Sequence, residues 1–198
     1  FIKNVQTNEG GIGIHFMDLD RYSIRNVDIT NVRDTAMLLE VGAEGTFGKV
    51  SVEDSSMNLS DTGSICVRFD TTGSTNPFDV VSFKNCLFFS TANTASTIGA
   101  QFNLGGVDIH FDNCQFESPS LAHVELNDET RVRFTTCSFI QNGTLATTSG
   151  FRLVNDNHCV IIDSCVFQKM TTVFDSISGS PSLELGGWSK NNGNITNV

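Results

Sequence analysis

Apolar and polar positions alternate in short segments along the chain, and one segment recurs. The segments "VSFKNCLF" (81–88), "IHFDNCQF" (109–116), "VRFTTCSF" (132–139) and "VIIDSCVF" (160–167) share the order apolar, any, apolar, any, small polar, Cys, any, Phe. A period of two is typical of strands with one buried face. The small polar residue interrupts the alternation and predicts a turn, because Asn and Asp tolerate the left-handed backbone conformation.

The small polar position recurs along the whole sequence with a loose period that averages about 28 residues. The column that it forms is Asn4, Asn26, Asp54, Asn85, Asn113, Thr136, Ser164 and Asn197. A second alternating segment lies between consecutive repeats, at 12–16, 38–41, 65–69, 98–102, 122–126 and 151–154. The pattern therefore predicts three short strands per repeat.

Repeats of this size without helical periodicity bury their apolar faces by stacking, each strand in parallel with its counterpart one turn away. The pattern resembles the right-handed parallel β-helix of pectate lyases and phage tailspikes, over essentially the whole chain. We expect an all-β fold, a right-handed single-stranded parallel β-helix of about seven turns. Residues 1–198 are expected to form one domain, and we expect the coil to continue beyond them because both ends cut a repeat.

Stacking predicts columns of like residues. Two inward columns account for much of the Phe content, which is 16 residues: Phe83, Phe111, Phe134 and Ile162 form one, and Phe88, Phe116, Phe139 and Phe167 the other. The small polar column is expected to form a side-chain hydrogen-bond ladder at the turn.

Four of the six cysteines fall beside that ladder, namely Cys86, Cys114, Cys137 and Cys165. We interpret them as buried free thiols that act as small apolar fillers, because stacked side chains point in parallel whereas a disulfide needs a dihedral angle near 90°. No Cys-x-x-Cys pair occurs, so no zinc site is predicted, and no other metal or cofactor is predicted. Cys66 is expected to point outward.

The charge pattern excludes some partners. Twelve Lys and Arg against 22 Asp and Glu give a net charge of −10, which argues against binding of nucleic acid. No apolar run is long enough to span a bilayer, so no membrane insertion is expected.

Carboxylates gather at the loop edge before the repeated strand. Those on consecutive repeats are expected to lie roughly 5 to 10 Å apart, the range in which paired acids cleave glycosidic bonds. Asp108, Asp128, Glu129 and Asp156 are the candidate catalytic residues within a larger set that also includes Asp18, Asp20, Glu44, Asp70 and Asp79. A solvated acidic edge without catalytic function is the alternative interpretation.

A second candidate region is the outward face of the repeated strand. His110 is expected beside Ser82 and Arg133, and Asp112 beside Lys84 and Thr135. His110 and Arg133 together with an Asp would suit a polysaccharide lyase or the binding of an acidic sugar. Cross-strand charge pairing explains Lys84 and Asp112 equally well.

Candidate substrate-binding residues are Asp79, Lys84, Asp112 and Trp188, the single indole of the chain. The outward residues Leu87, Phe89, Ile140 and Val166 are apolar and predict a surface covered by another chain. Because phage tailspikes of this fold are homotrimers, the resemblance implies a homotrimer.

The catalytic clusters of the pectinases are absent: neither the Asn-Thr-Asp, Gly-Asp-Asp and Gly-His-Gly set of polygalacturonases nor the Arg-x-Pro-x-x-Arg stretch of pectate lyases occurs. Irregular turns and polar loops are closer in character to phage tailspikes. The resemblance implies a tailspike segment, on a virion tail or extracellular, that binds and cleaves or only binds bacterial surface polysaccharide. The alternatives are a structural shaft or adhesin stalk, and a secreted polysaccharide lyase or hydrolase.

Overall fold

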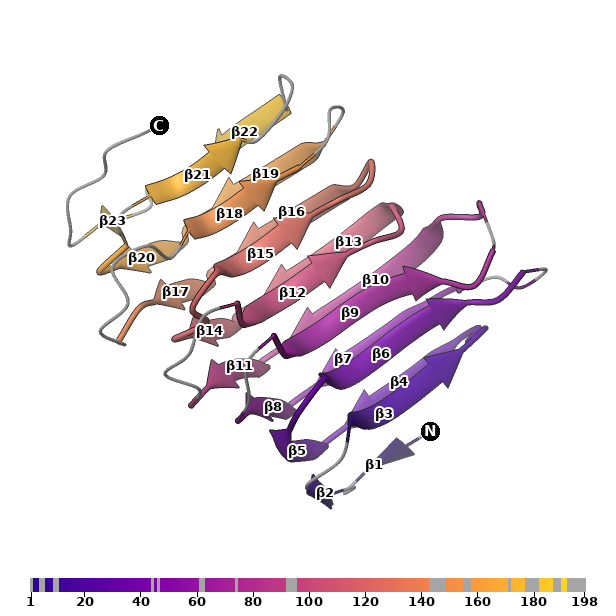
Figure 1. The fold of residues 1–198 in the computed structure, drawn as a ribbon. Helices are drawn as coiled ribbons and strands as arrows, with labels where there is room; N and C mark the ends of the chain where they lie inside the picture. Colours follow the sequence, from indigo (N-terminus) through magenta and orange to yellow (C-terminus); the bar gives the residue numbers. More distant parts are fainter. Residues whose placement is uncertain are drawn as a thin grey trace.

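The computed structural model is an all-β solenoid made of three parallel sheets (Figure 1). It describes residues 2–3, 6–8, 11–43, 45, 47–60, 63–73, 75–91, 96–142, 149–154, 158–170, 172–176, 182–186 and 190–191. This part of the chain contains no helix, and so none that could cross a membrane.

The first seven coils each give one strand to every sheet. Sheet A contains β1 (Ile2–Lys3), β4 (Tyr22–Arg25), β7 (Val50–Glu53), β10 (Phe78–Lys84), β13 (Gly106–Asp112), β16 (Arg131–Thr135), β19 (Cys159–Asp163) and β22 (Ser182–Gly186). Sheet B contains β2 (Gln6–Asn8), β5 (Asp28–Val32), β8 (Ser56–Leu59), β11 (Leu87–Ser90), β14 (Gln115–Glu117), β17 (Ser138–Ile140), β20 (Val166–Gln168) and β23 (Lys190–Asn191). Sheet C contains β3 (Ile12–Met17), β6 (Thr35–Val41), β9 (Ile65–Thr71), β12 (Ile98–Phe102), β15 (Ala122–Leu126), β18 (Ser149–Leu153) and β21 (Thr172–Ser176).

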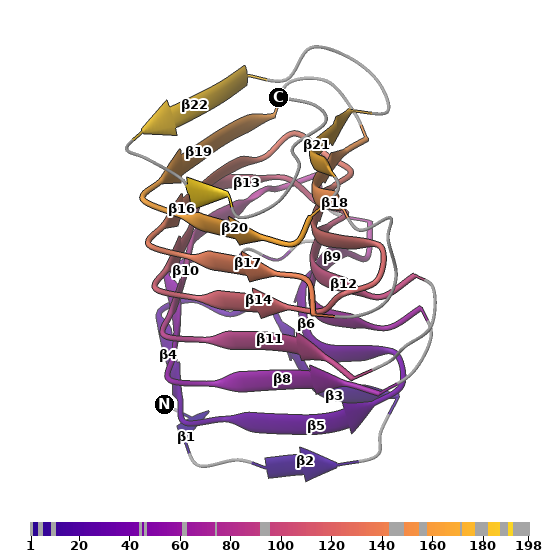
Figure 2. The same ribbon diagram turned by 90° about the vertical axis from the view of Figure 1, so that its left-hand side faces the viewer.

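The chain visits the sheets in the order A, B, C, and seven described coils contribute to all three. Pairing joins equivalent residues of neighbouring coils, so that Phe83 pairs with Val52 on one side and Phe111 on the other. Seen with sheet B toward the viewer, the chain crosses from left to right as it climbs (Figure 2). This is a right-handed coil, the hand that parallel connections adopt. The predicted fold is confirmed.

The interior is built from stacked phenylalanines, as predicted. Phe111 lies between Phe83 and Phe134, with ring centroids 4.9 Å apart on both sides and interplanar angles of 6° and 11°. The spacing of neighbouring coils is about 4.8 Å, so equivalent rings are forced into stacked contact. Both predicted columns are buried: Phe83, Phe111, Phe134 and Ile162 from sheet A, and Phe88, Phe116, Phe139 and Phe167 from sheet B.

The turn from sheet A to sheet B is made by one left-handed residue per coil. The φ angles lie between 51° and 54° at Asn26, Asp54, Asn85, Asn113, Thr136 and Ser164, which confirms that this column turns the chain. Asn85 Nδ2 donates to Asp54 Oδ1 and Asn113 Nδ2 to Asn85 Oδ1, both at 2.9 Å. The ladder stops at Thr136, whose hydroxyl donates instead to Asp112 Oδ1 at 3.3 Å.

The cysteine column is buried and reduced, as predicted. Cys114 illustrates its environment, since the sulfur lies 3.4 Å from the carbonyl oxygen of Asp112 and 3.5 Å from that of Phe83. Hydrogen bonding with the thiols of Cys137 and Cys86, together with burial, raises the pKa of Cys114 far above its usual range. These thiols therefore fill space.

The expected outward position of Cys66 is wrong. Its side chain is buried, and the sulfur lies 3.5 Å from the carbonyl oxygen of Met57 and 3.7 Å from that of Phe89. Ile65, Cys66 and Val67 are all buried, because the two-residue alternation breaks where the chain enters sheet C from sheet B. Burial raises the pKa of the Cys66 thiol well above its usual range.

His123 occupies the same position two coils later, with Gly99 and Gly150 as its neighbours in the column. The imidazole is fully buried; Nδ1 lies 3.3 Å from the carbonyl oxygen of Ser149, and Nε2 lies 3.3 Å from that of Ile140. Burial lowers the pKa of His123 to about 4. The folded protein therefore holds this histidine uncharged at neutral pH.

The outer face of sheet B carries Leu87, Phe89, Ile140 and Val166, all half-buried. They share one face, as their spacing predicted. Gln115 of β14 lies between Leu87 and Ser138, and Glu117 lies between Phe89 and Ile140. The apolar surface is therefore interrupted by polar side chains.

Replacing Thr136 by Asn is expected to stabilise the fold by about 1 kcal/mol. A β-branched residue is strained at positive φ, whereas Asn tolerates it and places an amide where the ladder would continue to Asn113. The measurement is the free energy of unfolding in urea. Thr135→Asn, one position earlier and at ordinary φ, is the control and should bring no gain; an unchanged or lower stability for Thr136→Asn would contradict the prediction.

Acidification is expected to destabilise the protein through His123. Its pKa is lower in the folded state than in the unfolded state, so the unfolded chain binds more protons, and stability falls as the pH drops from about 6.5 toward 4, by up to about 3 kcal/mol. Urea unfolding from pH 7 to pH 4 measures the loss. His123→Met should show a smaller loss over this range, and an identical pH slope in both proteins would refute the assignment.

Candidate functional site

The outer face of β10, β13 and β16 brings the second group of predicted residues together. Ser82, His110 and Arg133 are in register on these three strands, and so are Lys84, Asp112 and Thr135. Equivalent residues on neighbouring strands are separated by about 4.8 Å. We call this surface the sheet A face.

Asp108 lies on the sheet A face rather than in a loop, because β13 begins at Gly106. Its Oδ1 is 2.7 Å from Nε2 of His110, and both side chains are partly exposed, at 45% and 40%. An ionised carboxylate only accepts hydrogen bonds, so in the neutral imidazole the proton is on Nε2 and the lone pair is on Nδ1. Asp108 thus orients a histidine whose other nitrogen can accept a proton.

Two exposed arginines accompany this pair on the neighbouring strand. Arg133 is in register with His110. Val132 is in register with Ile109, so Arg131, one residue earlier, is at the position that corresponds to Asp108. Within the described residues neither arginine has an acidic partner within 4 Å, whereas Arg25 is paired with Glu53 at 3.0 Å. Sequence reasoning missed Arg131, although its spacing of two residues from Arg133 places both on one face.

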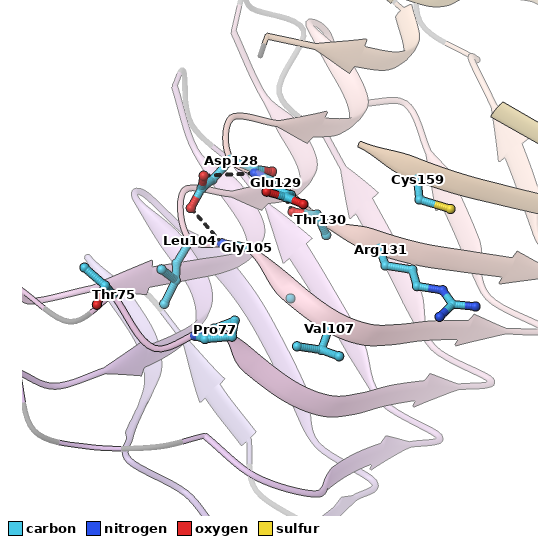
Figure 3. A pocket seen from close by; sticks show the side chains of 11 residues that line it. Thr75, Pro77, Leu104, Gly105, Val107, Asp128, Glu129, Thr130, Arg131 and Cys159 are labelled. Atoms are coloured by element: carbon cyan, nitrogen blue, oxygen red, sulfur yellow. Dashed lines mark hydrogen bonds between the residues drawn. The ribbon is translucent and has the colours of Figure 1, made fainter. Parts of the chain in front are cut away.

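An open groove lies where these strands begin, and we call it the upstream groove (Figure 3). Its volume is about 540 Å³. The lining comes from the loops before β10, β13 and β16 and from the start of β19: Thr75, Pro77, Leu104, Gly105, Gly106, Val107, Asp128, Glu129, Thr130, Arg131 and Cys159. Arg131 therefore belongs both to the groove and to the sheet A face.

Asp128 holds the wall of the upstream groove together. Its Oδ2 accepts the backbone N–H of Gly105 at 3.1 Å, and its Oδ1 accepts that of Glu129 at 2.9 Å (Figure 3). The hydroxyl of Thr130 donates to the Asp128 carbonyl oxygen at 2.7 Å. Both carboxylate oxygens of Asp128 thus serve the backbone of the loop, so the geometry supports a structural role for this residue.

The other candidates lie near the ends of the strands of the sheet A face or outside the described residues. Asp79 is exposed at the start of β10, and Lys84 is exposed at its end. Asp112 is half-buried and accepts a hydrogen bond from Thr136. Trp188, Asp156 and Glu44 lie outside the described residues.

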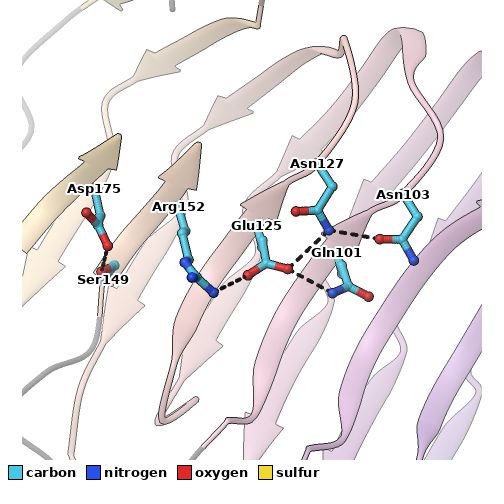
Figure 4. A network of polar contacts seen from close by, with 7 residues as sticks. All are labelled: Gln101, Asn103, Glu125, Asn127, Ser149, Arg152 and Asp175. Carbon is cyan, nitrogen blue, oxygen red and sulfur yellow. Dashed lines mark hydrogen bonds and ion pairs between the residues drawn. The ribbon is translucent and has the colours of Figure 1, made fainter. Parts of the chain in front are cut away.

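Sheet C carries a polar network that sequence reasoning did not find (Figure 4). The side chain of Glu125 is only 7% exposed and accepts from Arg152 at 2.9 Å, from Gln101 at 2.8 Å and from Asn127 at 3.1 Å. Asn127 also donates to Asn103 at 2.8 Å. Because these residues hydrogen-bond to one another across three coils, the network joins the coils and does not form an open site.

Within the described part of the chain, no three His, Cys, Asp or Glu side chains are grouped to hold a metal ion. Comparison with known protein families, with curated proteins and with solved structures finds no match. The structure assigns the chain to a fold, the parallel β-helix.

Proposed function

We propose that the sheet A face and the upstream groove bind a linear acidic polysaccharide of a bacterial surface. The observation that carries the proposal is the ordered pair of Asp108 and His110, with its 2.7 Å hydrogen bond, beside Arg131 and Arg133, which have no acidic partner within the described residues. Guanidinium groups bind carboxylates in bidentate geometry. On a chain with net charge −10, two guanidiniums that lack an acidic partner among the described residues favour a local anionic ligand.

The upstream groove supports a sugar ligand because it is open and of mixed polarity. Pro77 and Val107 offer apolar surface, while Glu129, Thr130 and Arg131 offer hydrogen-bonding groups. Val107 is 52% exposed, which leaves an apolar contact free for the face of a sugar ring. Saccharide sites combine such apolar contacts with a few placed polar groups.

Cleavage by β-elimination is the second candidate activity, favoured by the orientation of His110. In this reaction Nδ1 of His110 takes the proton from the carbon next to the uronate carboxylate, and the electron pair left behind forms a carbon–carbon double bond. The neighbouring glycosidic carbon–oxygen bond breaks, and the departing oxygen is protonated by water. Arg131 and Arg133 neutralise the carboxylate during proton removal. Hydrolysis has less support, because Asp128 serves the loop backbone.

The setting that we propose is a tailspike-like homotrimer, on a virion tail or secreted, with polysaccharide bound on the outside. The support for a trimer is the half-buried apolar set Leu87, Phe89, Ile140 and Val166 on sheet B, on a different sheet from the sheet A face. Light scattering of the protein used for binding reports its mass, and a monomer would remove this part of the proposal.

The test is binding to a panel of capsular and O-antigen polysaccharides that includes hyaluronan, alginate and polysialic acid. Arg133→Gln is expected to weaken binding of acidic glycans by about 10- to 100-fold, because a charge-assisted hydrogen bond is lost. Arg25→Gln removes an arginine from the same sheet, paired with Glu53 and outside the site, and should leave binding unchanged.

Chain length and ultraviolet absorbance follow cleavage in the same samples. Unsaturated ends that disappear in His110→Gln, with binding retained, indicate β-elimination; binding without shortening indicates a binding protein. The proposal fails if no glycan binds, or if both arginine variants weaken binding equally, and the coil then serves as a structural shaft.

A further inference from the structure

A second hollow lies at the opposite end of the same three strands, and we call it the downstream hollow. Its volume is about 320 Å³. The left-handed residues Asn85 and Asn113 turn the chain here from sheet A into sheet B, and the hollow lies at this corner. The lining consists of Asn85, Cys86, Leu87, Asn113, Cys114, Gln115 and Ser138.

The upstream groove and the downstream hollow flank the sheet A face on the same coils. The residues just before β10, β13 and β16 line the upstream groove, and residues just after these strands line the downstream hollow. β13, with seven residues, spans about 20 Å between them. The outer face of β13 between them, which we call the path, carries Asp108, His110 and Asp112 in a row.

The downstream hollow differs in chemistry from the centre of the path. Its polar groups are uncharged: the amides of Asn85, Asn113 and Gln115 and the hydroxyl of Ser138. Leu87 is half-buried and adds an apolar contact. Amide and hydroxyl groups both donate and accept hydrogen bonds, which suits sugar hydroxyls. One amide N–H of Asn85, Asn113 and Gln115 is already bonded, to Asp54, Asn85 and Glu117 respectively, so the second N–H of each is the donor offered to a sugar. Arg131 and Arg133, on the neighbouring strand β16, suit a carboxylate.

We infer that the ligand is an extended polymer that lies along β13, across the solenoid axis, with its carboxylate at Arg131 and Arg133 and a distant sugar in the downstream hollow. This inference rests on the proposed function and adds to it a second subsite and a direction. A path of about 20 Å selects a chain of several sugars over a disaccharide.

The alternative is that the polymer lies along the solenoid axis. Ser56 distinguishes the two directions. The corner continues toward the N-terminal end as another hollow of about 490 Å³, which Asp28, Asp54 and Ser56 help to line. Ser56 occupies the same column as Gln115, two coils earlier. A polymer along the axis would contact both residues, whereas a polymer along β13 contacts Gln115 and leaves Ser56 free.

The experiment measures affinities for oligosaccharides of hyaluronan, alginate and polysialic acid, from disaccharide to decasaccharide. Affinity should rise with length until the chain spans both depressions. Gln115→Ala and Ser138→Ala should weaken binding of the long oligosaccharides by about 3- to 10-fold and leave the short ones unchanged, since one neutral hydrogen bond is lost. Ser56→Ala is the matched control, and thermal unfolding confirms that all three variants are folded.

The outcomes separate this inference from the proposed function. Affinity that stops rising at the shortest oligosaccharide bound, or equal losses for Gln115→Ala on short and long chains, overturns the path along β13. Losses for Ser56→Ala as large as for Gln115→Ala mean that the polymer follows the axis. Absence of binding at every length overturns the proposed function and the inference with it.

Discussion

Parallel pairing between equivalent residues of neighbouring coils is the constraint on which the rest of the structure depends. It places equivalent side chains of neighbouring coils about 4.8 Å apart, so that residues of one type form a column. Inside, the columns are stacked phenylalanines such as Phe83, Phe111 and Phe134. At the corner the same repetition allows Asn113 to bond Asn85 and Asn85 to bond Asp54. A coil without its neighbours would have neither contact, so stability is shared between adjacent coils.

The same register builds the candidate site. His110 and Arg133 are distant in sequence but side by side in space because β13 and β16 pair residue by residue. The loops before these strands form the upstream groove, and the left-handed turns after them form the downstream hollow. Outward side chains have no role in the core, so they can supply charge and hydrogen bonds at fixed spacing. A rigid coil thereby presents a preorganised surface to an extended ligand.

Sequence reasoning predicted the structural features that recur from coil to coil and missed those that depart from the repeat. The period of two and the recurring Asn identified the strands, the Phe columns and the left-handed corner. Cys66 was misplaced because the alternation breaks at the corner into sheet C, where consecutive residues are all buried. Asp108 was expected in a loop because β13 begins at Gly106, three residues before the repeated segment that starts at Ile109. The Glu125 network joins Gln101, Glu125 and Arg152, which are register partners on sheet C, and the loose period did not fix the register of that sheet. Asp156 and Trp188 lie outside the described residues.

Distances along one outward column test the stacked coil most directly. Arg25, Lys84, Asp112 and Asp163 belong to one column of sheet A. Electron paramagnetic resonance measures the spacing between two spin labels. One label is placed on Arg25→Cys and the other on Lys84→Cys, Asp112→Cys or Asp163→Cys. Cys159→Ser removes the partly exposed thiol from all of these variants. In-register coils predict backbone separations of about 10, 14 and 24 Å. Separations that do not increase along this series would contradict the parallel β-helix.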